Sequence, residues 1–299
     1  MALLWKHAGG ETVLVPIFIA ALFFLATGAV LYAGLRVLSG QVAAALGLIA
    51  LAGTPFFVRH SAAQYADVPV GFFFLTTVIL LAVYDCDPGK RRGWLVLSGM
   101  AVSLAVWTKN EGLLFLVALA TARLLPAAVG REWRQLGRDM LALALGAAPA
   151  LLALVVFKIA FAPPDGLLAL QGWGAIVEKL GDWSRYQEVA AAFVKEVSSF
   201  GGGMSVVIIL TFALAGADWR RFKQRYWLSG MMVLLVMVIG FFFVYIITPQ
   251  RLTWYMGVSL NRILPQLWPM TVFLVLVNLR PTGIGGPPAS GGPPACGWD

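Results

Sequence analysis

Long runs of apolar residues recur along the 299-residue sequence and limit its fold more than any other feature. An α-helix rises about 1.5 Å per residue, so about 20 residues cross the roughly 30 Å hydrocarbon layer of a membrane. The sequence contains nine candidate spans, at residues 12–38, 42–58, 67–84, 94–107, 113–125, 139–161, 203–215, 226–247 and 263–279. Charged residues make up 12% of the chain, about half the share in soluble domains, which excludes a soluble protein. The high apolar content also excludes a disordered one.

The apolar runs are continuous and do not alternate with polar residues, which favours transmembrane helices over barrel strands. We therefore predict an all-α polytopic membrane protein with about nine transmembrane helices. The short runs at 94–107 and 113–125 could instead form one helix of about 48 Å, which is too long for a single span. A hairpin turning at residues 108–112 keeps the flanking basic clusters on one side of the membrane, and we expect the hairpin.

Basic residues divide unequally between the two sides that nine spans define. Thirteen Lys and Arg residues fall on one side, whereas five lie in the short segments of the other. The remaining basic residues surround the long loop at 161–202, and long loops count little in the positive-inside rule. The side with thirteen is therefore predicted to be cytoplasmic, which places Met1 outside. An exported N-terminus without a signal peptide leads us to expect a missing span upstream of Met1.

The chain is expected to consist of a transmembrane domain at 1–280 and a disordered Gly- and Pro-rich tail at 281–299. Within the domain, residues 161–202 show helical spacing of apolar side chains and predict amphipathic helices in the outer interface, acting as a cap or as a substrate-facing lid. Cys86 and Cys296 lack metal-site spacing. The net charge of +8 is attributed to cytoplasmic loops, so no nucleic-acid partner is expected.

Polar residues gather at the predicted outer ends of several spans. Charges beside membrane spans are costly and are therefore functional candidates. The first group lies at 54–69 and contains Arg59, Tyr65 and Asp67. Asp67 opens the next span, so the alternative to a functional role is an N-cap, worth roughly 1 kcal/mol.

Two further groups follow on the same predicted side. Lys109 and Glu111 lie in the hairpin turn, where they could merely neutralise each other, but a lysine is also a suitable counter-ion for a lipid phosphate. The last group combines arginine forks suited to phosphate with aromatic rings that could stack on a sugar or belong to the interfacial belt: Arg251, Trp254, Tyr255 and Arg262. For Arg262, snorkelling toward the interface is the alternative.

Three of these stretches resemble motifs of the polyprenyl-phosphate-sugar-dependent glycosyltransferases of the GT-C fold, which include the protein O-mannosyltransferases and the lipid A aminoarabinose transferases. The similar stretches are 54–69, the hairpin 107–112 and the segment 252–264, and the resemblance extends over residues 12–279. It implies inverting transfer from a polyprenyl-phosphate sugar to a lipid or protein acceptor, at the outer face of a bacterial plasma membrane. It also implies that basic residues, in some members with a divalent metal ion, hold the departing phosphate.

The resemblance assigns roles to individual residues. Asp67 matches the family's second outer carboxylate and becomes the candidate catalytic residue and metal ligand. The general base is expected upstream of Met1, because residues 1–11 are too short for the family's first span and outer loop; a truncated enzyme, inactive alone, and an incomplete gene model are the alternatives. The candidate substrate-binding residues are Arg59, Tyr65, Lys109, Glu111, Arg251, Trp254, Tyr255 and Arg262.

Two other classes of function are alternatives to an enzyme. A transporter or flippase for a lipid-linked or anionic substrate should carry ionisable residues near mid-span and paired repeats of broken helices. Here the charges collect at outer helix ends, and Lys158 is the closest exception. A non-catalytic scaffold would not need Asp67, Lys109 and Arg262 on one side. The sequence therefore favours a membrane glycosyltransferase.

Overall fold

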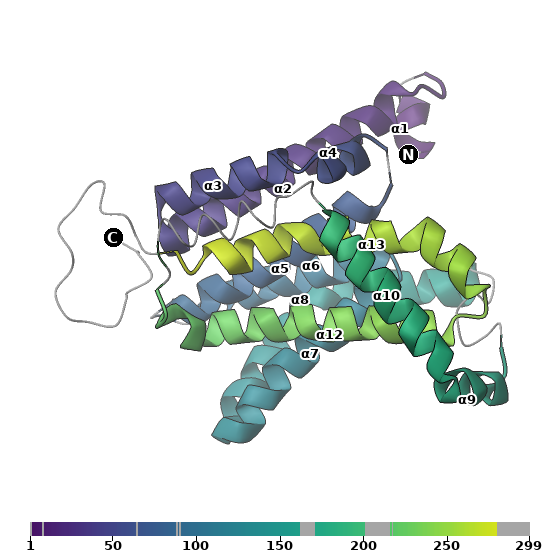
Figure 1. Ribbon diagram of the computed structural model, residues 1–299. Helices are drawn as coiled ribbons and strands as arrows, with labels where there is room; N and C mark the ends of the chain where they lie inside the picture. Colours follow the sequence, from purple (N-terminus) through teal and green to yellow (C-terminus); the bar gives the residue numbers. More distant parts are fainter. Residues whose placement is uncertain are drawn as a thin grey trace.

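Helices form all the regular elements in the part of the chain that the structure, a computed structural model, describes (Figure 1). The described residues are 2–7, 9–63, 65–87, 89, 91–161, 171–200, 216 and 218–279. The helices are α1 (Ala2–His7), α2 (Leu14–Ser39), α3 (Gln41–Ala52), α4 (Pro55–Ala62), α5 (Asp67–Cys86), α6 (Gly93–Thr108), α7 (Glu111–Gly130), α8 (Trp133–Ala160), α9 (Trp173–Gly181), α10 (Trp183–Ser199), the 3₁₀ turn η2 (Arg221–Lys223), α12 (Arg225–Ile247) and α13 (Leu252–Leu276).

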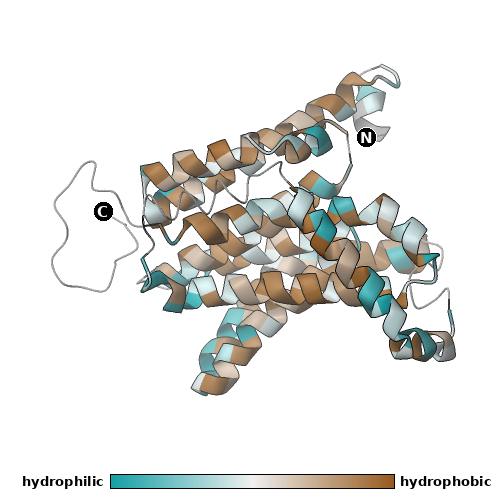
Figure 2. Cartoon of the chain, viewed as in Figure 1, coloured by the Kyte–Doolittle hydropathy of each residue, from teal (hydrophilic) through white to brown (hydrophobic). Residues whose placement is uncertain are grey.

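Five of these helices, α2, α5, α7, α8 and α12, are long and apolar enough to cross a membrane. A sixth span results if α3 and α4, which meet at an angle of 65°, are counted together. Figure 2 shows apolar residues along the length of the bundle and hydrophilic ones gathered toward its ends. The chain is thus an all-α polytopic membrane protein.

The remaining expected spans differ in detail from the sequence prediction. Helix α6 is apolar but shorter, and α13 begins at Leu252, well before the expected 263–279. The expected span 42–58 breaks between α3 and α4, because Pro55 disfavours a helical conformation for Thr54, which is extended. The expected span 203–215 and the tail 281–299 lie outside the described residues.

The expected hairpin between the two short apolar runs is confirmed. Helix α6 ends at Thr108, Lys109 takes an extended conformation, and α7 begins at Glu111. The turn is so tight that a Cβ atom on Gly112 would lie 2.4 Å from the carbonyl oxygen of Ala105. Glycine at this position therefore allows the first turn of α7 to contact the last turn of α6.

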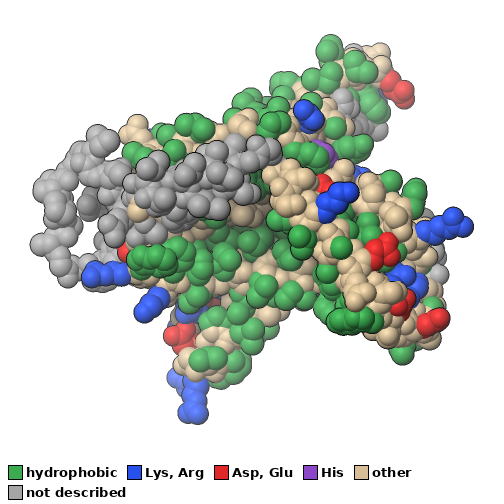
Figure 3. All heavy atoms as spheres, in the orientation of Figure 1, with side chains coloured by type: hydrophobic (Ala, Val, Ile, Leu, Met, Phe, Trp, Pro, Cys, Tyr) green, Lys and Arg blue, Asp and Glu red, His purple; other side chains and the backbone are tan. Residues whose placement is uncertain are grey.

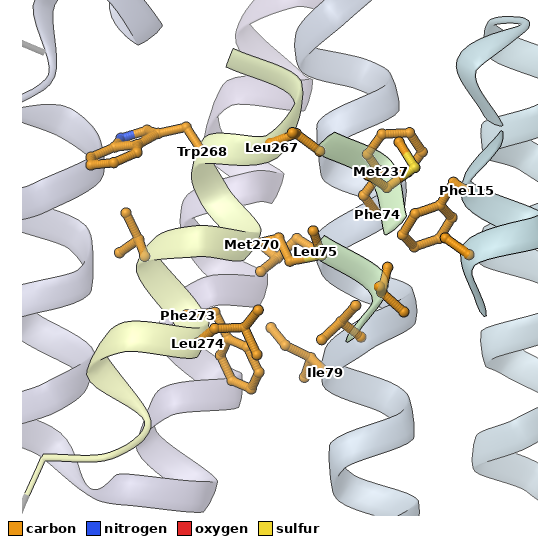
Figure 4. Packing of buried hydrophobic residues seen from close by; sticks show 14 of the residues in the cluster. Phe74, Leu75, Ile79, Phe115, Met237, Leu267, Trp268, Met270, Phe273 and Leu274 are labelled. Carbon is orange, nitrogen blue, oxygen red and sulfur yellow. The ribbon is translucent and has the colours of Figure 1, made fainter. Parts of the chain in front are cut away.

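Helix α5 forms the axis of the bundle and packs against α2, α6, α12 and α13. Its side chains are the best buried of any candidate span. Phe74 stacks on Phe115 of α7 with ring centroids 4.2 Å apart, while Leu75 and Ile79 face the α13 side near Met270 and Leu274 (Figure 4). This packing fixes the direction of α5, and with it the positions of the polar residues at both of its ends.

Small residues bring α6 and α8 into backbone contact. A Cβ atom on Gly99 would lie 2.0 Å from the carbonyl oxygen of Leu143, and one on Gly146 would lie 1.9 Å from that of Val96. Close approach through small residues is a common way for membrane helices to associate, because burial against lipid supplies little driving force.

Arg221 holds the ends of two helices together at the end of the bundle away from the α6–α7 turn. Its buried Nη1 donates to the carbonyl oxygens of Leu38 (2.8 Å) and Val277 (2.9 Å) and to Oγ of Ser39 (2.8 Å). These carbonyls lie at the C-terminal ends of α2 and α13, where the helical hydrogen-bond pattern leaves oxygens without partners. Arg221 therefore ties α2 to α13 and fixes how they enter the bundle.

The expected amphipathic segment contains two helices, α9 and α10, and α10 crosses α12 and α13 in Figure 1. Asp182 caps α10, and its hydrogen bond from the Ser184 hydroxyl lowers the pKa of this carboxyl group. Arg185 donates to the carbonyl oxygen of Ile246 (2.8 Å), and Glu188 accepts from the Thr253 hydroxyl (2.9 Å). The pair of helices thus braces the connection between α12 and α13.

The close contact between α6 and α8 gives a stability prediction. Gly146→Ala should lower the thermal unfolding midpoint of the purified protein in detergent, since overpacking against backbone costs about 1–3 kcal/mol. Gly137→Ala is the matched control in the same helix, because a Cβ atom there would meet no neighbouring side chain or helix within 4 Å. This control should be neutral or stabilising, because alanine favours a helix over glycine by up to about 1 kcal/mol. Equal midpoints for the two variants would contradict the contact.

Candidate functional site

Asp67 lies where α5, α13 and the α6–α7 turn meet, and its side chain is fully buried. Its Oδ1 accepts hydrogen bonds from Lys109 Nζ (2.7 Å) and Gln266 Nε2 (2.8 Å), and its Oδ2 accepts from Arg262 Nε (2.9 Å). The N-cap position of α5 is Ala66, with no side-chain capping bond. The carboxylate thus joins three distant segments of the chain, and the capping alternative does not describe its contacts.

Close backbone packing makes this convergence possible. A Cβ atom on Gly71, one turn after Asp67, would lie 2.9 Å from the carbonyl oxygen of Gln266. Arg262 and Gln266 are four residues apart on α13, so both side chains project from the same face of that helix. The absence of a side chain at Gly71 therefore lets both reach the one carboxylate.

The two cations around Asp67 have further partners. Lys109 Nζ lies 2.6 Å from a Glu111 carboxylate oxygen, and the Arg262 guanidinium carbon lies 4.3 Å from the centre of the Tyr65 ring. The side chains of Lys109 and Arg262 are 22% and 31% exposed, whereas Asp67 is not exposed at all. The cations therefore present part of their surface outward while the carboxylate holds them from behind. Snorkelling would require Arg262 to extend toward the membrane interface, but its side chain turns toward Asp67.

A cavity of about 630 Å³ opens beside these cations, a size typical of small-molecule sites. Polar groups line one part of it and apolar side chains of α7, α12 and α13 line the rest. The polar and aromatic lining residues are Lys109, Asn110, Glu111, Lys158, Phe241, Tyr245, Trp254, Tyr255, Ser259, Arg262 and Gln266. The cavity thus combines cationic groups with hydrogen-bonding and aromatic ones.

The structure brings together most of the residues that the sequence singled out. Lys109, Glu111, Trp254, Tyr255 and Arg262 line the cavity. Asp67 binds two of them, Lys109 and Arg262, and the Tyr65 ring packs on Arg262. Two candidates lie elsewhere: Arg59 on α4 and Arg251 before α13 are exposed and do not line the cavity.

Sequence reasoning missed several residues that complete the site. Gln266 could have been found from its spacing of four residues after Arg262, which places both on one helical face. Lys158, whose Nζ lies 3.3 Å from Asn110 Oδ1, stood out only as an ionisable residue near a span end. Tyr245, hydrogen-bonded to Ser259 at 2.9 Å, gave no signal of its own in an apolar run.

The donor set does not fit the metal ion that the resemblance suggested at Asp67. Among the described residues, no three His, Cys, Asp or Glu side chains come close enough to hold a metal. Two of the three groups that bind the Asp67 oxygens, Lys109 and Arg262, are cationic. A divalent cation prefers several oxygen ligands and would be repelled here, so the residues around Asp67 do not fit one.

Comparison with known proteins shows the family of the chain. No curated protein and no solved structure matches the chain. A model of the family described as dolichyl-phosphate-mannose-protein mannosyltransferase matches residues 4–159, which include Asp67, Lys109 and Glu111. Because the match covers more than half of the chain, the protein belongs to this family and is a membrane glycosyltransferase of the GT-C type.

Proposed function

We propose that the cavity beside Asp67 transfers a sugar from a polyprenyl-phosphate donor to a hydroxyl group of a protein or lipid acceptor. The observation that carries this proposal is the pair of cations, Lys109 and Arg262, held by one buried carboxylate at the wall of a 630 Å³ cavity. The family description, with its dolichyl-phosphate-mannose donor and protein acceptor, supports the same class of substrates.

The cations suit the step in which the donor is cleaved. As the bond between the sugar carbon and the phosphate oxygen breaks, its electron pair stays on that oxygen, and negative charge develops there. Preorganised cations at that position stabilise the transition state more than the ground state. Arg262 binds Asp67 through Nε, and its two Nη groups form no hydrogen bond with the described residues. They are therefore available to a phosphate as a fork.

In this proposal Asp67 is a positioning residue and not the base that deprotonates the acceptor. Its two oxygens accept three hydrogen bonds, two of them from cations, and its side chain is buried. A base must reach the proton it removes, and here the cations lie between Asp67 and the cavity. The carboxylate orients Lys109 and Arg262 toward the phosphate instead.

The aromatic and polar lining suits a sugar. Trp254, which is 60% exposed, and Tyr255 offer ring faces on which the apolar face of a sugar can pack. Asn110 and Ser259 place amide and hydroxyl groups in the same cavity. Both features also fit an interfacial belt, but the position of these groups in one cavity beside two cations favours substrate contact.

We further propose that this end of the bundle faces outward and that the transfer inverts the sugar configuration. The basic residues concentrate at the opposite ends of the same helices, at the C-terminal ends of α2, α5 and α7 and the N-terminal ends of α8 and α12. Short basic segments favour the cytoplasmic side. In a direct displacement the acceptor oxygen bonds to the sugar carbon opposite the leaving phosphate and releases its proton to a base or to solvent. The configuration of the sugar carbon is thereby inverted and no covalent enzyme intermediate forms.

The phosphate role of the cations gives the first functional prediction. Lys109→Ala and Arg262→Ala should each lower sugar transfer roughly 100-fold, as expected for removing one donor from a developing anion. Each should also weaken binding of a polyprenyl phosphate to the purified protein by roughly tenfold. Transfer is measured with a labelled polyprenyl-phosphate sugar, and binding by fluorescence quenching.

Matched controls are available on the same chain. Lys195 and Arg92 are exposed and do not line the cavity. Lys195→Ala and Arg92→Ala therefore change charge equally and should leave both measurements near wild type. Unchanged transfer and binding in the Lys109 and Arg262 variants would refute their assigned roles.

The positioning role of Asp67 gives a second prediction. Asp67→Asn keeps the shape but removes the shared anion, so polyprenyl-phosphate binding and transfer should fall together. The unfolding midpoint should fall as well, because two partly buried cations lose their counter-ion, a cost of about 1–3 kcal/mol given their partial exposure. Glu178→Gln, at an exposed acid on α9, is the matched control. Loss of transfer with undiminished phosphate binding would identify Asp67 as a reacting group and contradict the positioning role.

A further inference from the structure

A second polar cavity, of about 800 Å³, lies at the opposite end of the bundle. The end of α5, the turn between α7 and α8 and the start of α12 surround it, with Asp85 in its lining. Asp67 and Asp85 lie eighteen residues apart on α5, or about 27 Å along the helix. The two cavities share no lining residue, so the second one is not part of the proposed transferase site.

The floor of this cavity is a buried network of hydrogen bonds. Tyr84 donates from its hydroxyl to Asp139 Oδ1 (2.7 Å), and Gln135 donates to the same oxygen (2.8 Å) and to the Tyr84 hydroxyl oxygen (2.9 Å). Behind them, the buried Arg123 donates through Nη1 to both oxygens of Asp85, at 3.0 and 2.8 Å. Arg123 therefore offsets much of the acidic charge in the floor.

The rim of the cavity is rich in arginine. Arg131, Arg134 and Arg138 are exposed lining residues, and none of them forms an ion pair within the described segments. Arg225 also lines the cavity and pairs with Glu132 at 2.7 Å. Counting Arg123 behind the floor, five arginines surround three acids.

The placement of the rim arginines favours an anion between them. Arg134 and Arg138 are four residues apart on α8, so they lie on one face, where like charges repel each other. Arg131 caps α7 in the left-handed conformation, with φ of 55°, which turns the chain back toward the same cavity. Three exposed arginine forks that line one cavity, without an ion-pair partner among the described residues, form an arrangement suited to the oxygens of a phosphate.

We propose that this cavity binds a phosphate-bearing anion, supplied by the head group of an anionic phospholipid or by a soluble phosphate ester. A lipid fits the surroundings best, because Trp133 is 56% exposed at the rim and Val129 on the neighbouring turn of α7 is 87% exposed. Figure 3 shows Lys or Arg side chains beside apolar ones on the projecting end formed by α7 and α8. Basic pockets between transmembrane helices commonly bind such head groups.

The test compares the full chain with two triple variants that remove equal charge from the same end of the bundle. The first is Arg131→Ala, Arg134→Ala, Arg138→Ala. The second, a matched control, is Arg36→Ala, Arg92→Ala, Arg220→Ala, all exposed and outside the cavity. Each purified protein is titrated in detergent with phosphatidylglycerol, with phosphatidylcholine and with glycerol 3-phosphate, and the unfolding midpoint and lipid binding by native mass spectrometry are measured.

The wild type and the control should bind phosphatidylglycerol and gain thermal stability from it. The rim variant should bind it at least roughly tenfold more weakly. Stabilisation by phosphatidylglycerol but not by glycerol 3-phosphate would identify a lipid, whereas equal effects of both would identify a soluble ester; either result supports the phosphate site. No binding of either to the wild type, equal losses in both triple variants, or equal binding of phosphatidylcholine would overturn it.

Discussion

The interaction on which the site depends is the sharing of one buried carboxylate by groups from three parts of the chain. Asp67 comes from the first turn of α5, Lys109 from the α6–α7 turn, and Arg262 and Gln266 from α13. An unpaired charge in a buried position is very costly, so this carboxylate constrains the relative positions of all three segments. Pairing with Asp67 still leaves Lys109 and Arg262 partly exposed to the cavity. A phosphate in the cavity could therefore bind cations whose positions the fold already fixes.

Close packing through glycine supplies the precision that these hydrogen bonds need. Gly71 allows α13 to approach α5 next to Asp67, and Gly112 allows α7 to turn back on α6 beside Lys109. Gly99 and Gly146 hold α8 against α6 in a similar way, and α8 carries Lys158 to the cavity. A hydrogen bond of 2.7–2.9 Å tolerates little displacement, so side chains at these glycines would affect the site through the backbone, without touching a substrate.

The sequence predicted the helical membrane fold and much of the site, for a physical reason. Charged side chains beside membrane spans are rare because they cost free energy, so Asp67, Lys109 and Arg262 could be identified in an apolar sequence. The unequal division of basic residues between the two sides of the membrane predicted that all three lie on one side. Other features were not readable. The side-chain amide of a glutamine in a span, such as Gln266, can find hydrogen-bond partners in many ways. Its contact with Asp67 depends on how α13 packs against α5, which the sequence does not show. The sequence prediction missed the break before Pro55 because the apolar run continues through it. It included Arg59 and Arg251 among the candidate binding residues because charge alone does not say which way a side chain points.

The two ends of α5 show how differently one helix can use buried charge. At the Asp67 end one carboxylate faces two cations whose remaining surface opens into an aromatic cavity, an arrangement suited to a phosphate group that arrives, reacts and leaves. At the Asp85 end Arg123 binds Asp85 and Arg225 pairs with Glu132, and the three arginines without an ion pair within the described segments lie on the exposed rim. Cations on an exposed rim gain less from electrostatics than cations in a cavity screened from water, which suits a resident lipid better than a reacting group. The two proposed roles therefore differ with burial: the partly buried cations suit the stabilisation of developing charge, and the exposed ones suit the binding of a phosphate head group.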